Sequence, residues 1–597
     1  MPFEQGFLCR PIPSSPSLSH RNPLTEIVSI PKTRASFLVF GGRLAKSVSP
    51  SSNKKVMKSA RSRSPSPSLK SKKLEPAVSV AAFLFRRDFR TVDNTALQSL
   101  IEIATKESLP ILPLFFFNPV QCDEDKNAYF GKACFQFLCE SLEDLDKHQL
   151  NNNLVCLRGT DQECLQTIKE HGLSVRVLGY NADFTPFSLI RDACLNKTCA
   201  AEQIVTVVSA EEYTLLPLDT VVKDNEQPYS VFSAFYKRLL SDFSTKIKPP
   251  SGRNWNSSCL LKDAKQYFPK SCVTPTFEPL PRISDHGGRT EGLKRLEHVS
   301  KMKKYGEERN LIPEDLTSHL SPHLKFGTVS VREVWAESVA SLGLHHEFVR
   351  QLVWREFYAS LLHHHPRLAK AQLNIFAPAV IAEHSGASTK KEVTRLNDPF
   401  MVKYLSYKWK WEPEHFEQFK TGNTGVPLVD AAVRCLTATG WCHNRCRMVI
   451  ANFLVKVLHV DWREGERWFA TVAVDYDVSN NSGGWQWSSG QGADPQPYFR
   501  TFNPFRQSAN FDPECRYIYE WVPELKQVPP EVIHRWDEYC TKHKVKAGAS
   551  FEKKSPTKAS ATRPMDKVYE TSYCAPIVDI KKCTQNVIAN FKTYDKK

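Results

Sequence analysis

The chain has 597 residues, of which 41% are hydrophobic and 24% are charged, and its formal net charge is +16. This length exceeds what one ordinary hydrophobic core accommodates, so we expect two or more domains. Its apolar runs fall short of the roughly 20 residues that a membrane-spanning helix needs, so neither a transmembrane helix nor a membrane partner is expected.

The positive charge is concentrated at the two ends of the chain. Residues 1–74 carry a net charge of +12 and residues 541–597 carry +8, which leaves −4 on the 466 residues between them. Net charge therefore does not predict that the folded body binds nucleic acid. A DNA site there needs local clusters of Arg and Lys.

The 17 cysteines are scattered, and none forms a C-x-x-C pair. We interpret them as reduced thiols of an intracellular protein. Cys442, His443 and Cys446 lie close together in the sequence. Their spacing does not match the usual zinc patterns, so we expect core thiols there and no metal site.

Residues 1–76 are rich in Ser, Pro, Lys and Arg. This composition cannot bury a core and predicts a disordered basic tail. Its Arg/Ser-rich, acid-poor character is typical of organelle transit peptides, while Lys70, Lys72 and Lys73 equally fit a nuclear import signal. A plain solvated tail is the third interpretation. The compartment is thus expected to be the nucleus, a mitochondrion or another DNA-containing organelle.

Between residues 77 and 209, short apolar runs alternate with helical periods. The apolar runs are 80–85, 111–117, 154–157, 175–178 and 204–208, and the helical periods are 94–105, 134–148, 163–171 and 187–194. Alternating strands and helices at this spacing predict an α/β domain with a parallel sheet. The polar segment 181–185 follows a predicted strand, at the sheet edge where ligands often bind.

Residues 210–286 are interpreted as a connector, and amphipathic helices dominate from 287 to 540. The clearest helical periods are 331–342, 346–363, 427–439 and 445–458. The sequence therefore predicts a second, all-helical domain over 287–540. Residues 541–597 are lysine-rich and lose periodicity, so we expect another tail there.

Three helical segments carry candidate binding residues. Residues 317–321 place hydroxyls and free N–H groups at a helix start, which suits an anion but equally suits an ordinary N-cap. Gln351, Trp354, Arg355 and Tyr358 share one helix face, which alone indicates packing and a salt bridge. Residues 441–448 alone indicate an amphipathic helix with a solvated basic face.

The most informative stretch is residues 475–487, with the sequence DYDVSNNSGGWQW. It joins two acids, three amides, two glycines and two tryptophans in thirteen positions. Acids and amides can satisfy a polar ring system, and glycines let the backbone approach closely. Indoles offer flat, oxidisable surfaces. This composition predicts a flat, redox-active ligand.

The pattern D-x-D-x3-N-x-G-G-W-Q-W resembles the flavin-binding core of the photolyase/cryptochrome family, most closely the class I cyclobutane pyrimidine dimer photolyases. The resemblance continues in residues 440–448, 461–465 and 497–504, and more weakly from Val78 to Trp536. It implies a doubly wound parallel-sheet antenna domain followed by an all-helical domain that binds FAD. It also implies that the protein acts on double-stranded DNA containing pyrimidine dimers, as a monomer.

The resemblance implies particular FAD contacts in this chain. Arg447 is expected to pair with Asp475, Asp477 to lie near the isoalloxazine edge, and Asn481 to lie near its N5. The complete implied set is Tyr305, Thr317, Ser318, His319, Leu320, Ser321, Arg355, Asn444, Arg447, Asp475, Tyr476, Asp477 and Asn481.

The resemblance also implies lesion, DNA and electron-transfer residues. Trp354 and Trp487 are expected to sandwich the flipped lesion, and Arg445 to clamp a DNA phosphate. The implied DNA set is Arg309, Gln351, Trp354, Asn444, Arg445, Met448, Trp487 and Gln507. The implied electron-transfer row consists of Trp485, Trp462 and Trp409.

A light-dependent repair enzyme that splits the dimer with one electron from photoexcited reduced FAD is the function we expect. Two alternatives are a (6-4) photolyase and a cryptochrome that senses blue light without repair; a DASH-type protein is a further one. Asn444 and Met448 argue against (6-4) chemistry because neither side chain is an acid. Gln351, where class I enzymes usually carry Glu, argues in the other direction. The antenna, whether folate, deazaflavin, flavin or none, stays open.

Overall fold

The computed structural model describes residues 78–251, 256–369, 407–495, 497, 499–551 and 563–595. The predicted N-terminal tail and its targeting signals lie outside these residues. Among the described helices, none is both long enough and apolar enough to cross a membrane.

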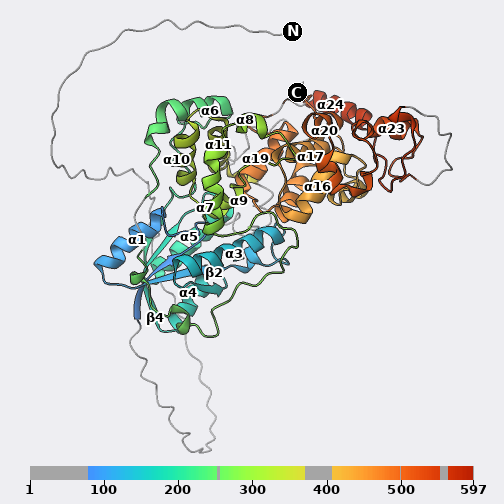
Figure 1. Ribbon diagram of the computed structural model, residues 1–597. Coiled ribbons are helices and arrows are strands. Elements are labelled where there is room, and N and C mark those ends of the chain that lie inside the picture. Colours follow the sequence, from blue (N-terminus) through green and yellow to red (C-terminus); the bar gives the residue numbers. More distant parts are fainter. Residues whose placement is uncertain are drawn as a thin grey trace, which may run out of the picture. The chain divides into compact units, whose positions relative to one another are not determined.

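A five-stranded parallel sheet organises the first domain (Figure 1). Its strands are β1 (Val78–Leu84), β2 (Ile111–Phe117), β3 (Val155–Arg158), β4 (Leu173–Asn181) and β5 (Val205–Ser209), in the order β3-β2-β1-β4-β5. Its helices are α1 (Thr95–Lys106), α2 (Pro119–Cys122), α3 (Lys132–Gln149), α4 (Asp161–Glu170) and α5 (Pro186–Ala201). Every residue of β2 is buried, as expected for a parallel sheet covered on both faces. The predicted α/β domain is confirmed.

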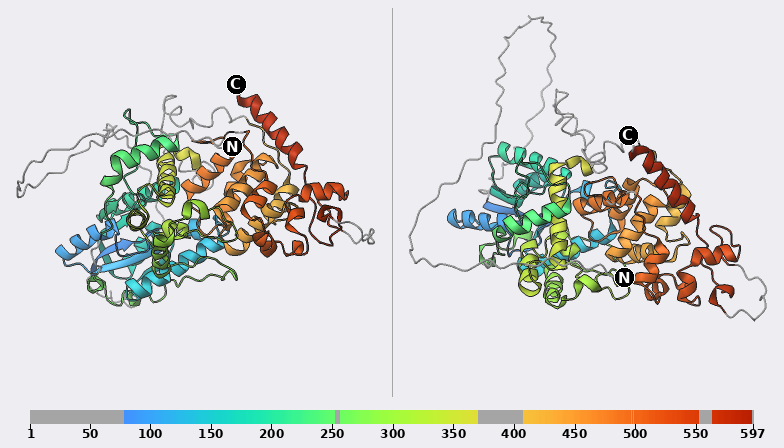
Figure 2. Two further views of the ribbon diagram at one scale, coloured as in Figure 1. Left: turned by 45° about the horizontal axis from the view of Figure 1, so that its top comes forward. Right: turned by 90° about the horizontal axis from the view of Figure 1, so that it is seen from above.

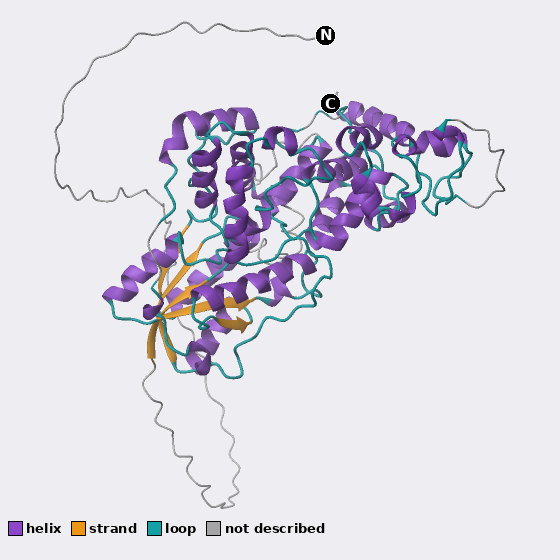
Figure 3. Ribbon diagram, viewed as in Figure 1, coloured by secondary structure: helices purple, strands orange, loops and turns teal. Residues whose placement is uncertain are grey.

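Helices make up the second domain, as Figure 3 shows. In chain order they are α7 (Arg289–His298), α8 (Tyr305–Glu308), α9 (Ser321–Phe326), α10 (Val331–Leu342), α11 (Glu347–His364), α15 (Pro413–Lys420), α16 (Pro427–Thr439), α17 (Asn444–Lys456), α18 (Trp462–Val472), α19 (Val478–Ser489), α20 (Pro504–Phe511), α21 (Arg516–Trp521), α22 (Pro530–Ile533) and α23 (Trp536–Lys542). The predicted all-helical domain is confirmed.

Local signals explain where several of these helices begin and end. Ser330 and Glu333 form a capping box at the start of α10. Pro427 opens α16, and Gly440, with φ +74°, closes it. Asp477 caps α19 by accepting a hydrogen bond from the backbone N–H of Asn480. The cap fixes the carboxylate of Asp477 at the start of this helix.

Buried polar contacts join the two domains. The guanidinium of Arg332 lies 2.9 Å from the carboxylate of Asp93, and the hydroxyl of Ser330 donates to the same carboxylate. Arg90 donates to the carbonyl oxygen of Gly327 at 2.8 Å. These groups are almost fully buried, so breaking one partner would leave an uncompensated polar group in the interior.

The predicted connector contains a helix that belongs to the core. In α6 (Phe232–Arg238), Phe232 and Phe235 are 1% and 2% exposed. Both rings pack against Phe357 of α11. With only seven residues, α6 is too short to give a clear helical period in the sequence.

The C-terminal part differs from the predicted tail. Residues 563–595 end in α24 (Ile580–Asp595), drawn in red in Figure 2, which contacts α17. The hydroxyl of Tyr573 donates to the buried carboxylate of Asp430 at 2.5 Å. Val587 and Phe591 of α24 are buried. The many lysines of this region mask a short apolar helix face, which is why composition predicted a tail.

Candidate functional site

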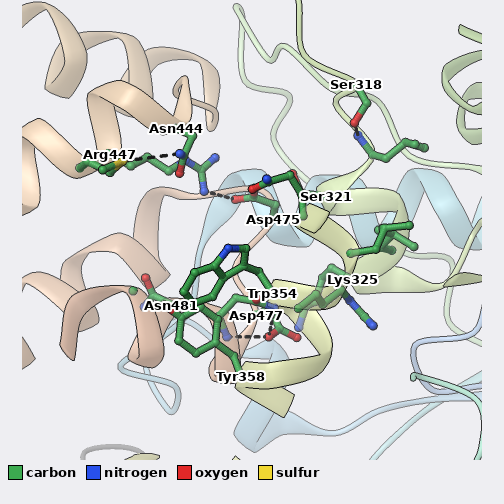
Figure 4. Close-up of a pocket in the computed structure, with 18 of the residues that line it drawn as sticks. Ser318, Ser321, Lys325, Trp354, Tyr358, Asn444, Arg447, Asp475, Asp477 and Asn481 are labelled. Atoms are coloured by element: carbon green, nitrogen blue, oxygen red, sulfur yellow. Dashed lines mark hydrogen bonds and ion pairs between the residues drawn. The ribbon is translucent and has the colours of Figure 1, made fainter. Parts of the chain in front are cut away.

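A cavity of about 820 Å³ is lined by residues of α8, α9, α11, α17 and α19 (Figure 4). Its volume lies within the range of cofactor sites, roughly 300–1,000 Å³. The sequence-predicted residues that line it are Tyr305, Arg309, Ser318, Leu320, Ser321, Gln351, Trp354, Arg355, Asn444, Arg447, Met448, Asp475, Tyr476, Asp477, Asn481, Trp485 and Trp487. Segments nearly 200 residues apart in the sequence thus form one site.

Arg447 and Asp475 form an ion pair in the cavity wall, with 2.9 Å between Nη1 and Oδ1. The hydroxyl of Ser321 donates to the other carboxylate oxygen at 2.6 Å. Figure 4 shows this link from α17 through Asp475 to α9. The pair implied by the resemblance is therefore present, and it ties the start of α9 to the middle of the helical domain.

The groups around Asp477 favour its ionised form. Burial alone would raise its pKa, but the positive charges of Arg87, Arg355 and Lys325 hold the pKa of Asp477 well below its usual range. Nη1 of Arg87 lies 3.4 Å from Oδ2 of Asp477. A buried carboxylate in this state can accept a hydrogen bond from a ring N–H or ribose hydroxyl of a ligand in the cavity.

The side chain of Asn481 is oriented by a residue that the sequence did not single out. Its amide nitrogen donates to the backbone carbonyl of Glu466 at 2.9 Å and to the carboxyl of Glu466 at 3.1 Å. Burial raises the pKa of Glu466 to about 7, although hydrogen bonds from Tyr129 and Asn481 oppose the shift. Since the amide nitrogen is engaged, the amide oxygen is left for a ligand.

Trp354 is held flat by a second aromatic ring. Its indole stacks on Phe232 of α6 with centroids 3.5 Å apart and planes 4° apart. Trp354 and Trp487 are both half-buried and line the cavity. Asn444 and Met448, one helical turn apart in α17, also line it, and the amide of Asn444 donates to the sulfur of Met448 at 3.7 Å.

The three tryptophans of the predicted row differ in exposure. Trp485 lines the cavity and is 3% exposed, Trp462 is 4% exposed, and Trp409 is half-buried. All three belong to or pack against one hydrophobic cluster. A Cβ at Gly465 would lie 2.2 Å from the indole of Trp485, so this glycine is needed for the close approach of α18 to α19.

Four of the residues assigned to FAD or DNA do not line the cavity: Thr317, His319, Arg445 and Gln507. His319 stacks on Trp441 at 4.0 Å and hydrogen-bonds to Asp285 and Asp315. Thr317 donates to Asp315. These contacts are structural, so the predicted cofactor contacts of the two residues stay predictions.

The two remaining residues lie on neighbouring helices. Arg445 of α17 donates to the side-chain oxygen of Asn310 and stacks over Phe511, with 4.4 Å from its guanidinium carbon to the ring centre. Gln507 lies on α20, and its side chain is half-buried. Their predicted DNA contacts stay predictions.

A second, smaller cavity of about 210 Å³ lies at the carboxyl edge of the sheet. Asp183 and Thr185 of the predicted ligand segment line it, together with Arg87 and Arg191. Asn181 instead donates to Asn94 at 2.8 Å inside the domain and does not line the cavity. Only part of segment 181–185 therefore faces a space that a ligand could enter.

The chain matches two family models and several known proteins. Residues 81–251 match the model described as DNA photolyase, and residues 348–593 match the FAD binding domain of DNA photolyase. A deoxyribodipyrimidine photo-lyase of Halobacterium salinarum is 30% identical over 475 residues, covering 76% of this chain and 92% of that protein. One from Escherichia coli is 29% identical over 493 residues, covering 79% and 94%.

The chain is also similar to solved structures of photolyases. The Sulfolobus tokodaii photolyase, solved with two FAD molecules, aligns with a TM-score of 0.64 at 29% identity, covering 86% of this chain and 99% of that one. A class III photolyase of Agrobacterium tumefaciens aligns with a TM-score of 0.67 at 25% identity, covering 89% and 100%. With its sheet domain, its helical FAD-binding domain and these relatives, the chain belongs to the photolyase/cryptochrome family.

Proposed function

We propose that this protein is a deoxyribodipyrimidine photo-lyase, which splits cyclobutane pyrimidine dimers in DNA under blue light. One observation carries the proposal. A single cavity brings the residues assigned to FAD, such as Asp477 and Asn481, together with those assigned to the lesion, such as Trp354 and Trp487. Electron transfer over a short distance requires this proximity.

The residues of the cavity fit FAD. Ser318 supplies a hydroxyl for a phosphate oxygen, Asp477 supplies an anionic acceptor, and Asn481 supplies an oriented amide oxygen. When bound and fully reduced, FAD supplies a photoexcitable donor of one electron. The protein's part is to hold this group in place and keep water away.

The lesion side of the cavity suits a flipped pyrimidine dimer. Such a dimer stacks and pairs poorly in the duplex, so its extrusion costs less than that of intact bases. Trp354, fixed by Phe232, and Trp487 present flat surfaces for it. Asn444 and Met448 offer hydrogen bonding and apolar contact but no acidic proton, which fits dimer splitting and does not fit the proton transfer of (6-4) repair.

Basic residues at the cavity suit the DNA backbone. Arg309 and Arg350 line the cavity and share one counter-ion, Glu347, with 3.4 Å and 3.8 Å between guanidinium and carboxylate. Two cations against one anion leave an excess of positive charge for phosphates. We therefore expect binding of double-stranded DNA to weaken as salt rises.

A lesion-choice experiment tests the proposed function. Photoreduced protein is mixed with duplexes that contain one cyclobutane dimer, one (6-4) product or no lesion. Binding is measured in the dark and repair under blue light. We expect selective dark binding and light-dependent repair of the cyclobutane dimer. Repair of the (6-4) product alone, or no lesion binding at all, would overturn the proposal.

Compartment and assembly are part of the same proposal. The basic, Ser/Pro-rich segment 1–76 supports delivery to the nucleus or to a DNA-containing organelle. A fluorescent fusion of the full chain, compared with one lacking residues 1–76, tests this. We expect the purified protein to be a monomer in light scattering, since lesion capture uses one cavity of one chain.

A further inference from the structure

Trp409, the outermost member of the predicted electron-transfer row, lies beside a second aromatic cluster. This cluster consists of Tyr407, Val587 and Phe591, with Trp409 and Tyr594 packed against it. It forms where residues 407–409 meet α24. This cluster was not predicted, because α24 falls in the predicted tail.

The rings of this cluster are close enough for electron transfer by direct contact. The centroids of Tyr407 and Trp409 are 4.6 Å apart with planes at 64°. Tyr407 is 6% exposed, whereas Trp409 is half-buried. The phenol of Tyr407 is therefore the nearest oxidisable neighbour of Trp409 among the described aromatic contacts that involve Trp409.

The phenol of Tyr407 is hydrogen-bonded to an imidazole. Its hydroxyl oxygen lies 2.9 Å from Nε2 of His459. The amide nitrogen of Asn590 lies 3.3 Å from the same Nε2 and points a second donor at it. Two donors on one ring nitrogen make that nitrogen the acceptor, so the ring proton sits on Nδ1.

Burial favours the neutral form of His459, and neutral Nε2 can accept a proton from an oxidised phenol because that phenol is a far stronger acid. Burial lowers the pKa of His459 to about 4, and the nearby charge of Lys410 acts in the same direction. The backbone N–H of Lys410 donates to the carbonyl of His459 at 3.0 Å, and His459 adopts the left-handed conformation, with φ +61°. The chain thus holds this imidazole in an uncommon backbone conformation directly beside the phenol.

We infer that Tyr407 is a redox-active residue that donates an electron to oxidised Trp409, with His459 accepting the phenolic proton. This inference rests on the proposed function, because the oxidant is the indole radical cation that photoexcited oxidised flavin generates through the tryptophan row.

The step balances in electrons and protons. One electron passes from the phenol of Tyr407 to the radical cation of Trp409, which returns to the neutral indole. The O–H bond of Tyr407 breaks, and its proton forms an N–H bond at Nε2 of His459. The products are a neutral tyrosyl radical and an imidazolium. A tyrosine that could not release its proton would be much harder to oxidise, which is why the 2.9 Å hydrogen bond matters.

Oxidation of Tyr407, coupled to proton transfer to His459, would affect the lifetime of the charge-separated state. The hole moves one residue farther along the row and becomes a neutral radical separated from its proton. Charge recombination is then slower, because Tyr407 must regain both an electron and its proton. The cluster would lengthen the lifetime of the charge-separated state that leads to reduced FAD.

Radical spectroscopy of the purified, oxidised holoenzyme tests the inference. Transient absorption and electron paramagnetic resonance after a blue flash distinguish tryptophanyl from tyrosyl radicals, and ring-deuterated tyrosine confirms the assignment. In the wild-type protein we expect a tryptophanyl signal that decays into a tyrosyl signal, more slowly in deuterated water. In Tyr407→Phe, which keeps the ring, we expect loss of the tyrosyl signal and a persistent tryptophanyl signal.

Two further variants separate the roles. His459→Gln keeps a hydrogen-bonding side chain but removes the base, so we expect loss of most tyrosyl signal there as well. Tyr594→Phe is the matched control, because the Tyr594 ring lies 5.0 Å from that of Tyr407 in the same cluster, and we expect it to keep the signal. Loss in Tyr594→Phe with retention in Tyr407→Phe would overturn the inference.

The outcome also separates this inference from the proposed function. A tryptophanyl signal that never converts to a tyrosyl signal overturns the role of Tyr407 alone. The absence of any tryptophanyl signal overturns the tryptophan row and the inference together. Dimer repair by protein reduced in advance does not need the row, so failure of that repair overturns the proposed function independently.

Discussion

The carboxyl group of Glu466 accepts a hydrogen bond from the side-chain amide of Asn481 at 3.1 Å, and Asn481 lines the large cavity. The two residues are 15 positions apart and belong to α18 and α19. This contact fixes which end of the Asn481 amide faces the cavity. The carboxyl group of Glu466 is therefore separated from the proposed FAD site only by the side chain of Asn481.

Glu466 should make stability depend on pH. Burial raises the pKa of Glu466 to about 7 from an ordinary 4.5. Its contribution to the free energy of unfolding is therefore fully present below about pH 4.5 and is lost as pH rises through about 7. We expect Glu466→Gln, which cannot ionise, to gain stability relative to the wild type between about pH 5 and about pH 8. Urea unfolding at both pH values measures this, and a pH-independent difference would contradict it.

His319 should make the free energy of unfolding depend on pH over a higher range than Glu466 does. Burial opposes its charge, but hydrogen bonds to Asp285 and Asp315 raise the pKa of His319 to about 9 from 6.5. The stabilisation is fully present below about pH 6.5 and is lost as pH rises through about 9. We expect His319→Gln to lose on the order of 3 kcal/mol at the low end of this window and progressively less toward the high end. Thermal or urea unfolding across the window measures the difference, and a loss that grows with pH would contradict the assignment.

Gly465 should be required for the position of Trp485. Because an added Cβ would lie 2.2 Å from the indole, we expect Gly465→Ala to destabilise the protein by about 1–3 kcal/mol and to slow photoreduction. Gly484→Ala in α19 is the matched control for stability only, because Gly484 lines the cavity. Its Cβ meets no atom within 4 Å, and alanine favours a helix. Equal losses in both variants would show that steric contact with Trp485 is not the cause.

Phe232 should contribute to binding of the lesion and not to binding of undamaged DNA. We expect Phe232→Leu to weaken dark binding of dimer-containing duplex, because Trp354 loses the ring that holds it at 3.5 Å. Binding of undamaged duplex should stay unchanged. Phe235→Leu is the control, since Phe235 is equally buried in α6 but packs on Phe357. Equal weakening of both duplexes in Phe232→Leu would contradict a role in the lesion pocket.

Gln351 is the site where this chain departs from the class I pattern. Its amide nitrogen donates to the backbone carbonyl of Glu347 at 3.1 Å, and its side chain lines the cavity. A carboxylate there would accept stronger hydrogen bonds from base N–H groups, so we expect Gln351→Glu to bind dimer-containing DNA about tenfold more tightly. Titration of labelled duplex in the dark measures this. Unchanged or weaker binding would show that Gln351 already suits the lesion.

The features that could be predicted from the sequence are those that depend on a local pattern of residues. The apolar runs of β1 to β5, the helical period of α10 and the acid-amide-glycine-tryptophan motif each lie within a short stretch of sequence, so local residues are enough to predict them. The pair of Arg447 and Asp475 could be named in advance because each residue stands in a motif that resembles the family.

The remaining contacts depend on partners that are distant in the sequence. Phe232 stacks on a ring 122 positions away, and no local pattern marks α6 as part of the core. Glu466 stands one residue beyond the matched motif, and its role follows only from its contact with Asn481. The cluster around Tyr407 was missed because the lysines of the C-terminal region concealed the apolar face of α24.

The most direct test of the central claim is the fate of one defined cyclobutane thymine dimer in a duplex. The full-length protein, with its FAD reduced in advance, is illuminated with blue light, and the two restored thymines are quantified against a dark control and a Trp354→Ala variant. We predict restoration in the light, none in the dark, and a strong loss in the variant. An unchanged dimer after illumination, with FAD demonstrably reduced and bound, would contradict the account.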